Sequence, residues 1–405
     1  MKVNTTPWVE AAEAIELLGV SRATLYAYVS RGHIRSEALA GSTRRRRYSR
    51  DDLERFAARA RERRNPEKAA EQALHWGMPI LESAITLIAD EKIYYRGQDV
   101  SVLAGASSLA DVAALIWTGT AESSAFVPPS RLLPAAPRLK QAVPFVAAAQ
   151  AALALDGARN KLAYDFRPHA VAQTGWRIAW QLACVASGLD TPGETIDATL
   201  ANAWGVPRAA DLIRAAMILC ADHDLNVSTF AARCVASAGS SPYNVVIAGL
   251  AALEGTKHGG TTARIEACWD ALRCARNLPG EFAQRLRRDE PISGFGHPLY
   301  PHGDPRARVL LAMLPKGKSA TFAREFADAA QVVVGEAPTV DFALVAVARA
   351  LGLPSDAAMI LFAIGRTIGW IGHAIEQYDK NAIIRPRARY VGEQPATGRH
   401  LPGSA

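Results

Sequence analysis

The sequence of 405 residues has few aromatic and few charged residues. Aromatic residues make up 7% and charged residues 21%, whereas 49% are hydrophobic. This composition supplies enough apolar side chains for a large core, which excludes an intrinsically disordered chain, and the length predicts more than one domain. No run of 18 or more apolar residues occurs, so the sequence predicts no membrane-spanning helix and no membrane as a partner.

Cysteines and export signals are equally scarce. The five cysteines are an odd number and form no CxxC pair. We therefore expect reduced, mostly buried thiols and no metal site. The opening MKVNTTPWVEAAEAIE has one lysine and early acids instead of a basic stretch followed by an apolar core. This opening predicts no secretory signal and a cytoplasmic protein.

The positive charge is concentrated at one end of the chain. Residues 1–66 hold 14 Lys and Arg against 8 Asp and Glu, which is a net charge of +6. The whole chain has 46 against 39, so the remainder is left with 32 against 31 and is nearly neutral. This asymmetry predicts two modules with different partners, joined by a linker near Pro66.

The basic module begins with a predicted helix, turn and helix over residues 9–31. Gly19 is expected to end the first helix, and Ser21 to cap the second. The second helix would present groups that suit phosphates and base edges on its outer face. These are Arg22, Thr24, Tyr26 and Tyr28.

A wing is predicted after this helix pair. A short extended segment at Ile34 and Arg35 would precede the run Arg44, Arg45, Arg46 and Arg47. Residues 8–60 resemble the winged helix-turn-helix of the MerR and excisionase type, which implies double-stranded DNA as a partner. The alternative is an exposed, solvated face, but four adjacent arginines repel one another without a polyanion nearby.

The neutral module is predicted to be mainly α. From about residue 79 onward apolar residues recur with helical spacing, and Ser108, Asp111 and Gly119 mark the two ends of one such helix. Only a small hairpin is expected, at residues 84–96. No GxxxxGK[ST] motif occurs, so no phosphate-binding loop of that kind is predicted.

Polar residues of this module fall into five clusters. In chain order they are His223 in ADHDLNVST, His258 in KHGGTTARIE, His297 and Arg306 in GFGHPLYPHGDPRA, Asp341 in TVDF, and a last cluster that holds Arg366 in IGRTIGW and Arg385 in IIRPRARYVG. Each cluster alone has a structural interpretation, such as a hydrogen-bonded core histidine, a helix cap or an ion pair.

Together and in this order, the clusters resemble the citrate synthase family over about residues 79–395. The resemblance implies a nearly all-α fold and a homodimer, in which a small domain closes over the substrates bound to a large one. The domains implied are 1–66 for the winged helix-turn-helix and linker, 67–260 with 352–405 for the large domain, and 261–351 for the small domain.

The same resemblance implies the condensation of acetyl-CoA with oxaloacetate to citrate and CoA, with acetyl-CoA as a substrate and no further cofactor. Asp341 matches the base, His258 the donor to the thioester oxygen, and His297 the group that polarises the ketone. The dicarboxylate would be bound by His223, Arg306 and Arg366, together with Arg385 of the partner subunit.

The sequence departs from the family after GFGH, where Pro298 to Gly303 replace the basic residues often found there. CoA phosphates favour Lys or Arg, so the usual CoA contacts are in doubt. Two alternatives therefore stay open. One is 2-methylcitrate synthesis from propionyl-CoA, since one methylene changes affinity by only about 1–3 kcal/mol. The other is a transcription regulator whose enzyme-like module senses a metabolite without turning it over.

Overall fold

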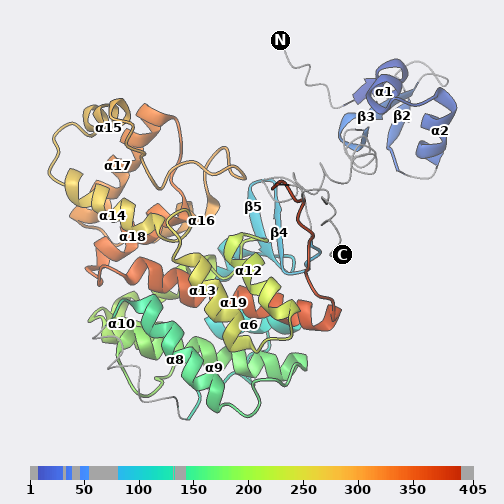
Figure 1. Cartoon of the computed structure of the whole chain (residues 1–405). Coiled ribbons are helices and arrows are strands. Elements are labelled where there is room, and N and C mark those ends of the chain that lie inside the picture. The colour runs from blue at the N-terminus through green and yellow to red at the C-terminus, as the bar shows by residue number, and fades with distance from the viewer. Residues whose placement is uncertain are drawn as a thin grey trace, which may run out of the picture. The chain divides into compact units, whose positions relative to one another are not determined.

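A computed structural model describes residues 8–30, 33–38, 46–53, 81–130, 132 and 143–393. The chain divides into two compact units, residues 1–82 and residues 83–405 (Figure 1). The linker predicted near Pro66 lies outside the described residues, and the proposed domain boundaries stay a prediction.

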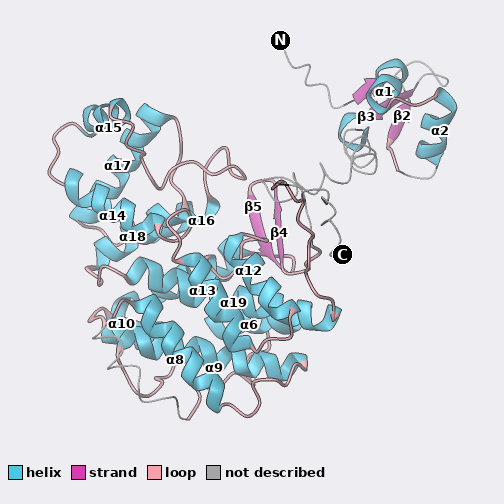
Figure 2. Cartoon of the chain, viewed as in Figure 1, coloured by secondary structure: helices cyan, strands magenta, loops and turns pink. Residues whose placement is uncertain are grey.

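The first unit combines helices with a three-stranded antiparallel sheet in the order β1-β3-β2 (Figure 2). Val9 of β1 and Ser36 of β2 both pair with Tyr48 of the central strand. The elements are β1 (Trp8–Glu10), α1 (Ala11–Leu18), α2 (Arg22–Ser30), β2 (Ser36–Ala38) and β3 (Arg46–Ser49). Their buried apolar side chains form one small core, made of Val9, Ala14, Leu25, Ile34, Tyr48 and Leu53.

The predicted ends of the helix pair are confirmed. Gly19 ends α1 in the left-handed region at φ 62°, and the Ser21 hydroxyl accepts a hydrogen bond from the Thr24 amide at 3.2 Å. Tyr28 was predicted to face outward, but it is half-buried against the small core.

The extended segment predicted at Ile34 and Arg35 is wrong by about two residues, because the strand is Ser36–Ala38. Ile34 is buried in the core. The backbone amide of Arg35 donates to the Asp52 carboxylate at 2.9 Å, and its side chain binds the same carboxylate. These contacts occupy both residues before the strand begins.

The second unit starts with a small antiparallel meander in the order β4-β5-β6. Its strands are β4 (Thr86–Ala89), β5 (Lys92–Tyr95) and β6 (Gln98–Asp99), as the predicted hairpin required. Among the described residues after the meander, every element longer than an isolated bridge is a helix, so the mainly α fold is confirmed.

One set of helices in the second unit is here called the body. It comprises the helices of this unit that precede residue 261, together with the last helix. These are α5 (Val100–Ala106), α6 (Leu109–Thr118), α8 (Phe145–Arg159), α9 (Pro168–Ser187), α10 (Ile196–Ala203), the 3-10 helix η1 (Pro207–Ala209), α11 (Ala210–Leu219), α12 (Val227–Ser237), α13 (Pro242–Leu253) and α19 (Ala357–Lys380). Ser108 and Asp111 form the predicted capping box at the start of α6.

The remaining helices, here called the cap, are gathered on one side of the unit (Figure 1). They are α14 (Thr261–Leu272), α15 (Leu278–Arg287), α16 (Pro305–Met313), α17 (Lys318–Val334) and α18 (Val340–Leu351). The cap contacts the body through α18 against α19 and through α16 against α11 and α5.

The centre of the body is α19, which packs against helices on several sides, including α6, α9, α11, α12 and α13. By length and composition it is the one helix of the described residues that could cross a membrane, but 94% of its apolar window is buried inside the fold. Such burial is what a core helix of a folded domain requires.

Helices α19 and α11 approach closely enough for their backbones to touch. A Cβ atom at Gly365 would overlap the carbonyl oxygen of Met217, and one at Gly369 would overlap that of Ala221. The Gly369 amide donates to the Ala221 carbonyl at 2.9 Å. Only glycine allows this approach, which fixes α19 against the end of α11.

We expect Gly365→Ala to lower the stability of the second unit by about 1–3 kcal/mol, because the added methyl group forces two packed backbones apart. Denaturant unfolding of the full chain, followed through the transition of this unit, measures the loss. Gly105→Ala is the matched control: Gly105 also lies in a helix, but a Cβ there meets nothing within 4 Å. It should be neutral or gain up to about 1 kcal/mol from helix propensity. Equal effects of the two substitutions would contradict this account of the contact.

Candidate active site

Six of the seven site residues predicted in the neutral module interact within one region, mostly at the ends of helices. His223 lies in the loop between α11 and α12, and His258 in the turn before α14. His297 precedes α16, while Arg306 and Asp341 occupy the first turns of α16 and α18. Arg366 projects from α19.

Two histidines and a tyrosine form one edge of this region. The rings of His223 and His297 lie 5.3 Å apart, and that of Tyr300 lies 4.8 Å from His297. His223 Nε2 is 2.7 Å from the Tyr300 hydroxyl. Burial, with the nearby Arg306 and Arg366 guanidinium groups, holds the pKa of His223 well below its ordinary value. His223 is therefore a neutral ring at pH 7.

His297 is neutral as well. Burial lowers its pKa to about 4, and Arg306 acts in the same direction. The Leu299 amide donates to His297 Nδ1 at 3.2 Å. A neutral imidazole that accepts at Nδ1 carries its proton on Nε2, so His297 has a hydrogen-bond donor at that nitrogen.

Arg306 is held by a buried carboxylate that sequence analysis did not assign a role. Its Nε and Nη2 donate to Asp304 at 3.0 and 2.8 Å, and both side chains are at most 4% exposed. Asp304 also accepts from the Val340 amide at 3.0 Å. One carboxylate thus joins the first turns of α16 and α18 and places Arg306 beside Asp341.

Asp341 is a half-buried carboxylate with a raised pKa. Loss of solvation raises its pKa to about 6; Arg306 and Arg366 oppose this shift and Asp304 reinforces it. The group is therefore mostly ionised at pH 7 and a much better proton acceptor than an ordinary carboxylate.

The glycine-rich loop before His297 is paired to the chain that leads into α18. Gly296 donates to the Ala337 carbonyl at 3.0 Å, and Thr339 donates to the Gly294 carbonyl at 2.8 Å. Gly294 and Gly296 have φ of 94° and 76°, a backbone conformation that side-chain-bearing residues rarely adopt. This pairing ties the position of His297 to that of Asp341.

His258 contacts a hydroxyl that has three polar neighbours. Its Nε2 lies 3.0 Å from Ser228 Oγ, which accepts from Trp370 Nε1 at 3.3 Å and donates to Asn226 Oδ1 at 2.9 Å. The ring stands edge-on to Phe362 at 6.0 Å. Burial, assisted by Arg366, lowers the pKa of His258 to about 4, so it too is neutral at pH 7.

Arg366 is 1% exposed and only partly satisfied. Its Nε donates to the Cys220 carbonyl at 2.8 Å, and its guanidinium lies 4.7 Å from the centre of the Phe362 ring. In the part of the chain that the structure describes, its Nη1 has no hydrogen-bond partner. A buried cation with an unused donor suits an anionic ligand.

A buried polar network includes Asp222, the residue before His223. His373 Nε2 lies 3.3 Å from the Asp222 carboxylate, which also accepts from the Thr86 hydroxyl at 2.5 Å. Arg233, with no exposed side-chain surface, pairs with Glu376 at 3.2 Å. Although burial alone would raise it, the contacts with His373 and Thr86 and the charge of Arg366 hold the pKa of Asp222 below its ordinary value.

Arg385 is the one predicted residue that the structure does not bring to this region. It is exposed in the segment after α19, where the Gln377 side chain donates to the Ala382 carbonyl at 2.7 Å and the Ile384 amide donates to Ser237 at 3.0 Å. Its predicted role in a partner subunit stays a prediction.

The unusual loop after His297 is held by a hydrogen bond. His302 Nδ1 lies 2.6 Å from Glu91 in the turn between β4 and β5, and this hydrogen bond lowers the pKa of Glu91. Pro298 and Leu299 are exposed. The loop therefore presents Pro298, Leu299 and His302 to solvent, with no Lys or Arg among residues 298–303.

Among the described residues, no group of three or more His, Cys, Asp or Glu could hold a metal ion. The cysteines in this part of the chain are all free thiols, as the sequence predicted. Burial raises the pKa of Cys220, which lies next to the site, to about 12. It is therefore a poor nucleophile at pH 7.

The candidate DNA-binding residues lie in the first unit. Arg22 is exposed and Tyr26 is 50% exposed on α2, but Thr24 is half-buried, with its hydroxyl 2.9 Å from that of Ser21. Thr24 thus belongs to the helix cap. Arg44 and Arg45 lie outside the described residues.

Arg46 and Arg47 begin β3 and are both exposed. Arg46 donates to the Ser36 hydroxyl at 3.0 Å, and Arg47 donates to Glu37 at 2.6 Å. Exposed pairs of this kind contribute little stability, so phosphates can replace these partners at low cost.

Comparison with protein families gives one match for each unit. A model described as "Citrate synthase, C-terminal domain" matches residues 73–387. A model of a helix-turn-helix domain matches residues 8–61.

Individual relatives agree with the first of these matches. The chain is 36% identical to citrate synthase 2 of Bacillus subtilis over 193 residues, which are 46% of this chain and 52% of that protein. It is 32% identical to 2-methylcitrate synthase 2 of Corynebacterium glutamicum over 185 residues, 44% of this chain and 48% of that protein. The chain thus spans about half the length of the curated relatives it matches.

Solved structures match over a longer stretch. The citrate synthase of Thermotoga maritima superposes with a TM-score of 0.64 at 26% identity, covering 80% of this chain and 96% of that one. The ternary complex of carboxymethyl coenzyme A and oxaloacetate with the Thermoplasma acidophilum citrate synthase gives 0.69 at 24% identity, covering 82% and 98%. With a family model matched over most of its length, this chain belongs to the citrate synthase family.

Proposed function

We propose that the second unit condenses acetyl-CoA with oxaloacetate, releasing citrate and CoA, and that the first unit binds double-stranded DNA. The observation that carries the enzymatic proposal is the grouping of two buried arginines, three neutral histidines and one carboxylate of raised pKa in a single site. This combination of perturbed pKa values in one place is more typical of a functional site than of structural ion pairs.

The arginines suit a dicarboxylate. Arg366 has a buried donor with no hydrogen-bond partner among the described residues, and Arg306 lies beside it with its charge already balanced by Asp304. A substrate carboxylate would complete the bonds of Arg366, since guanidinium groups favour planar anions. His223 would donate a further hydrogen bond, and Arg385 of a second subunit would close the dicarboxylate site.

Asp341 and His258 would activate the acetyl group. Asp341 would remove a proton from the thioester methyl group. Its pKa of about 6 is closer than that of an ordinary carboxylate to the high pKa of this methyl group, which makes the proton transfer easier. For this step the Ser228 hydroxyl, which donates to Asn226 Oδ1 in the structure, would turn to donate to His258 Nε2, so that the neutral ring carries its proton on Nδ1. That proton would stabilise the developing enolate oxygen without adding a charge.

His297 would complete the carbon–carbon bond. Its Nε2 proton would polarise the ketone of oxaloacetate, and the enolate carbon would attack the ketone carbon. The alkoxide formed would take up that proton, leaving citryl-CoA. The water that then attacks the thioester would return a proton to His297, and the proton held by Asp341 would leave with the CoA thiol.

Two alternatives remain for the substrate and for turnover. Propionyl-CoA would give 2-methylcitrate, as the name of the Corynebacterium glutamicum relative suggests for that protein. The loop from Pro298 to Gly303, which lacks Lys and Arg, favours a third possibility, a unit that binds the dicarboxylate as a signal and does not use CoA.

One assay separates these possibilities. Release of free thiol is measured from acetyl-CoA and from propionyl-CoA, each with and without oxaloacetate, alongside oxaloacetate binding by calorimetry. Oxaloacetate-dependent thiol release identifies an acyltransferase, and the better acyl donor names the reaction. Oxaloacetate binding without thiol release from either donor identifies the sensor, and no binding at all contradicts the proposal.

We expect Asp341→Asn to lower turnover by about a hundredfold to ten-thousandfold while oxaloacetate binding persists, because the amide keeps the shape but accepts no proton. The activity of the unsubstituted enzyme should rise with pH through about 6, as Asp341 ionises, and the variant should lack this rise. Asp328→Asn, on the exposed face of α17, is the control. A loss of only a few fold would remove Asp341 as the base.

Because Arg385 lies away from the site of its own chain, we expect a homodimer with shared sites. Mixing Arg385→Ala with Asp341→Asn subunits should restore about a quarter of the unsubstituted activity, since half the dimers then hold one intact site. Mixing His297→Ala with Asp341→Asn should restore none, because both changes affect the same side of the shared site. Equal results from the two mixtures, with subunit exchange demonstrated, would refute the shared site.

We expect duplex DNA to bind the first unit with an affinity that falls steeply as salt rises. Replacing Arg44 to Arg47 by alanine should weaken binding to every sequence and reduce the salt slope by about 0.9 for each phosphate that is no longer neutralised. Changes at Arg22 or Tyr26 should instead alter sequence preference. Arg324→Ala, an exposed arginine of α17, is the charge-matched control. Binding that does not change with salt, or no binding to genomic DNA fragments at low salt, would contradict the proposal that the first unit binds DNA.

A further inference from the structure

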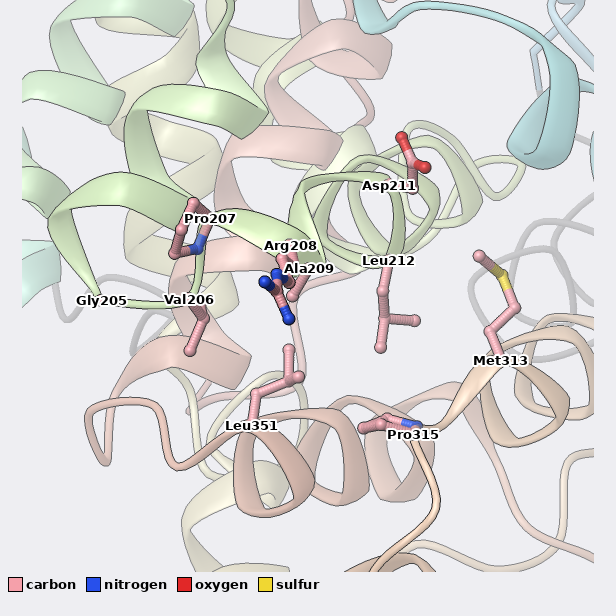
Figure 3. A pocket seen from close by; sticks show the side chains of 10 residues that line it. All are labelled: Gly205, Val206, Pro207, Arg208, Ala209, Asp211, Leu212, Met313, Pro315 and Leu351. Atoms are coloured by element: carbon pink, nitrogen blue, oxygen red, sulfur yellow. The ribbon is translucent and has the colours of Figure 1, made fainter.

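A cavity of about 540 Å³ lies between the body and the cap (Figure 3). Its volume falls in the range of sites for small organic molecules. The body contributes the turn from Gly205 through η1 to the start of α11, and the cap contributes the ends of α16 and α18. The apolar walls are Val206, Pro207 and Leu212 on one side and Met313, Pro315 and Leu351 on the other.

The charge inside this cavity comes from one side chain. Arg208 points into it, with its guanidinium between Val206 and Leu212 and facing Leu351 (Figure 3). In the described part of the chain Arg208 has no hydrogen bond and no ion pair. The other charged lining residue, Asp211, is already paired with Arg214 at 2.9 Å. The cavity is open to solvent, and it offers an exposed guanidinium that no carboxylate of the described residues binds beside its apolar walls.

Three helices run from this cavity to the site. Helix α11 begins at the cavity and ends just before the His223 loop. Helices α16 and α18 run the other way, carrying Arg306 and Asp341 in their first turns and reaching the cavity at Met313 and Leu351. The cavity is thus one helix length from the chemistry, about 15 Å, and is separate from the site.

We propose that this cavity binds a small molecule with an apolar body and a single anionic group, which pairs with Arg208. An apolar body of that kind fills the space between the two walls, and the anion meets the Arg208 guanidinium. Since the ligand would touch both the body and the cap, it would favour one distance between them. It would therefore act as an effector.

The probe for the binding test is 8-anilinonaphthalene-1-sulfonate, an aromatic body with one sulfonate, titrated into the full-length protein and followed by fluorescence. Arg208→Ala should raise the Kd of its tightest site about tenfold, the effect of losing one charge-assisted hydrogen bond. Arg208→Lys should change it by less. Arg287→Ala, an exposed arginine of α15, should leave it unchanged.

A second variant tests the cavity without changing its charge. Ala209→Trp would place an indole between the apolar walls and should abolish the Arg208-dependent binding, while the melting temperature of the protein confirms that it is folded. Probe binding that neither Arg208→Ala nor Ala209→Trp alters would overturn the proposal. So would the absence of binding, which would also result from a segment of this chain or a second copy covering the cavity.

The effector role rests on the proposed function, and its test is separate. If oxaloacetate changes the separation of body and cap, it must change the Kd of the probe, and the probe must change the Kd of oxaloacetate by the same factor. Arg208-dependent binding of the probe that oxaloacetate leaves unchanged, although oxaloacetate itself binds, would overturn the effector role and keep the site. A protein that does not bind oxaloacetate would instead contradict the proposed function.

Discussion

Two guanidinium groups, those of Arg306 and Arg366, are buried in one region of the fold, and the cost of burying charge determines what surrounds them. Arg306 is compensated by Asp304, which also fixes the first turn of α18 through the Val340 amide. Arg366 has a backbone carbonyl and an aromatic face, and one of its nitrogens is left without a partner among the described residues. Arg306 therefore has its charge balanced within the fold, whereas Arg366 keeps a donor that an anion could bind. This asymmetry leaves Arg366 as the group with which an anionic ligand would pair.

The same two charges set the protonation of everything near them. They add to burial in lowering the pKa of His223, and each also acts on one of the other site histidines. They oppose the rise in the pKa of Asp341 without cancelling it. The outcome is a group of hydrogen-bond donors that are neutral at pH 7 beside a carboxylate basic enough to take a proton. Such donors can stabilise a developing oxyanion without first pairing with the substrate as cations would.

Sequence reasoning found the residues with distinctive neighbours and missed those that act through burial. His258 beside two glycines, Asp341 at the head of an apolar helix and Arg366 in α19 were all visible as clusters. Asp304 was visible only as the residue before Pro305, because its pairing with Arg306 and Val340 depends on how two helices meet. Ser228 and the Asp222–His373–Arg233 network involve contacts between residues up to 151 positions apart, which no local pattern contains. The strand after Ile34 was misplaced for the same reason, since the distant Asp52 decides where it begins.

The groups proposed to bind the dicarboxylate and those proposed to bind and activate the acyl donor differ in how many of the required contacts the described residues provide. Both an enzyme and a sensor would need Arg306, Arg366 and His223, so these residues cannot distinguish the two functions. The acyl side can, because only an enzyme needs to hold CoA and to deprotonate its acyl group. Asp341 carries a raised pKa that a sensor does not need, whereas the loop at His302 is tied to Glu91 and offers CoA phosphates no Lys or Arg. If turnover occurs, the phosphates must be held by basic residues elsewhere in the chain or in a second subunit. The raised pKa is the stronger indication, because desolvating a carboxylate costs stability and such shifts cluster at functional sites.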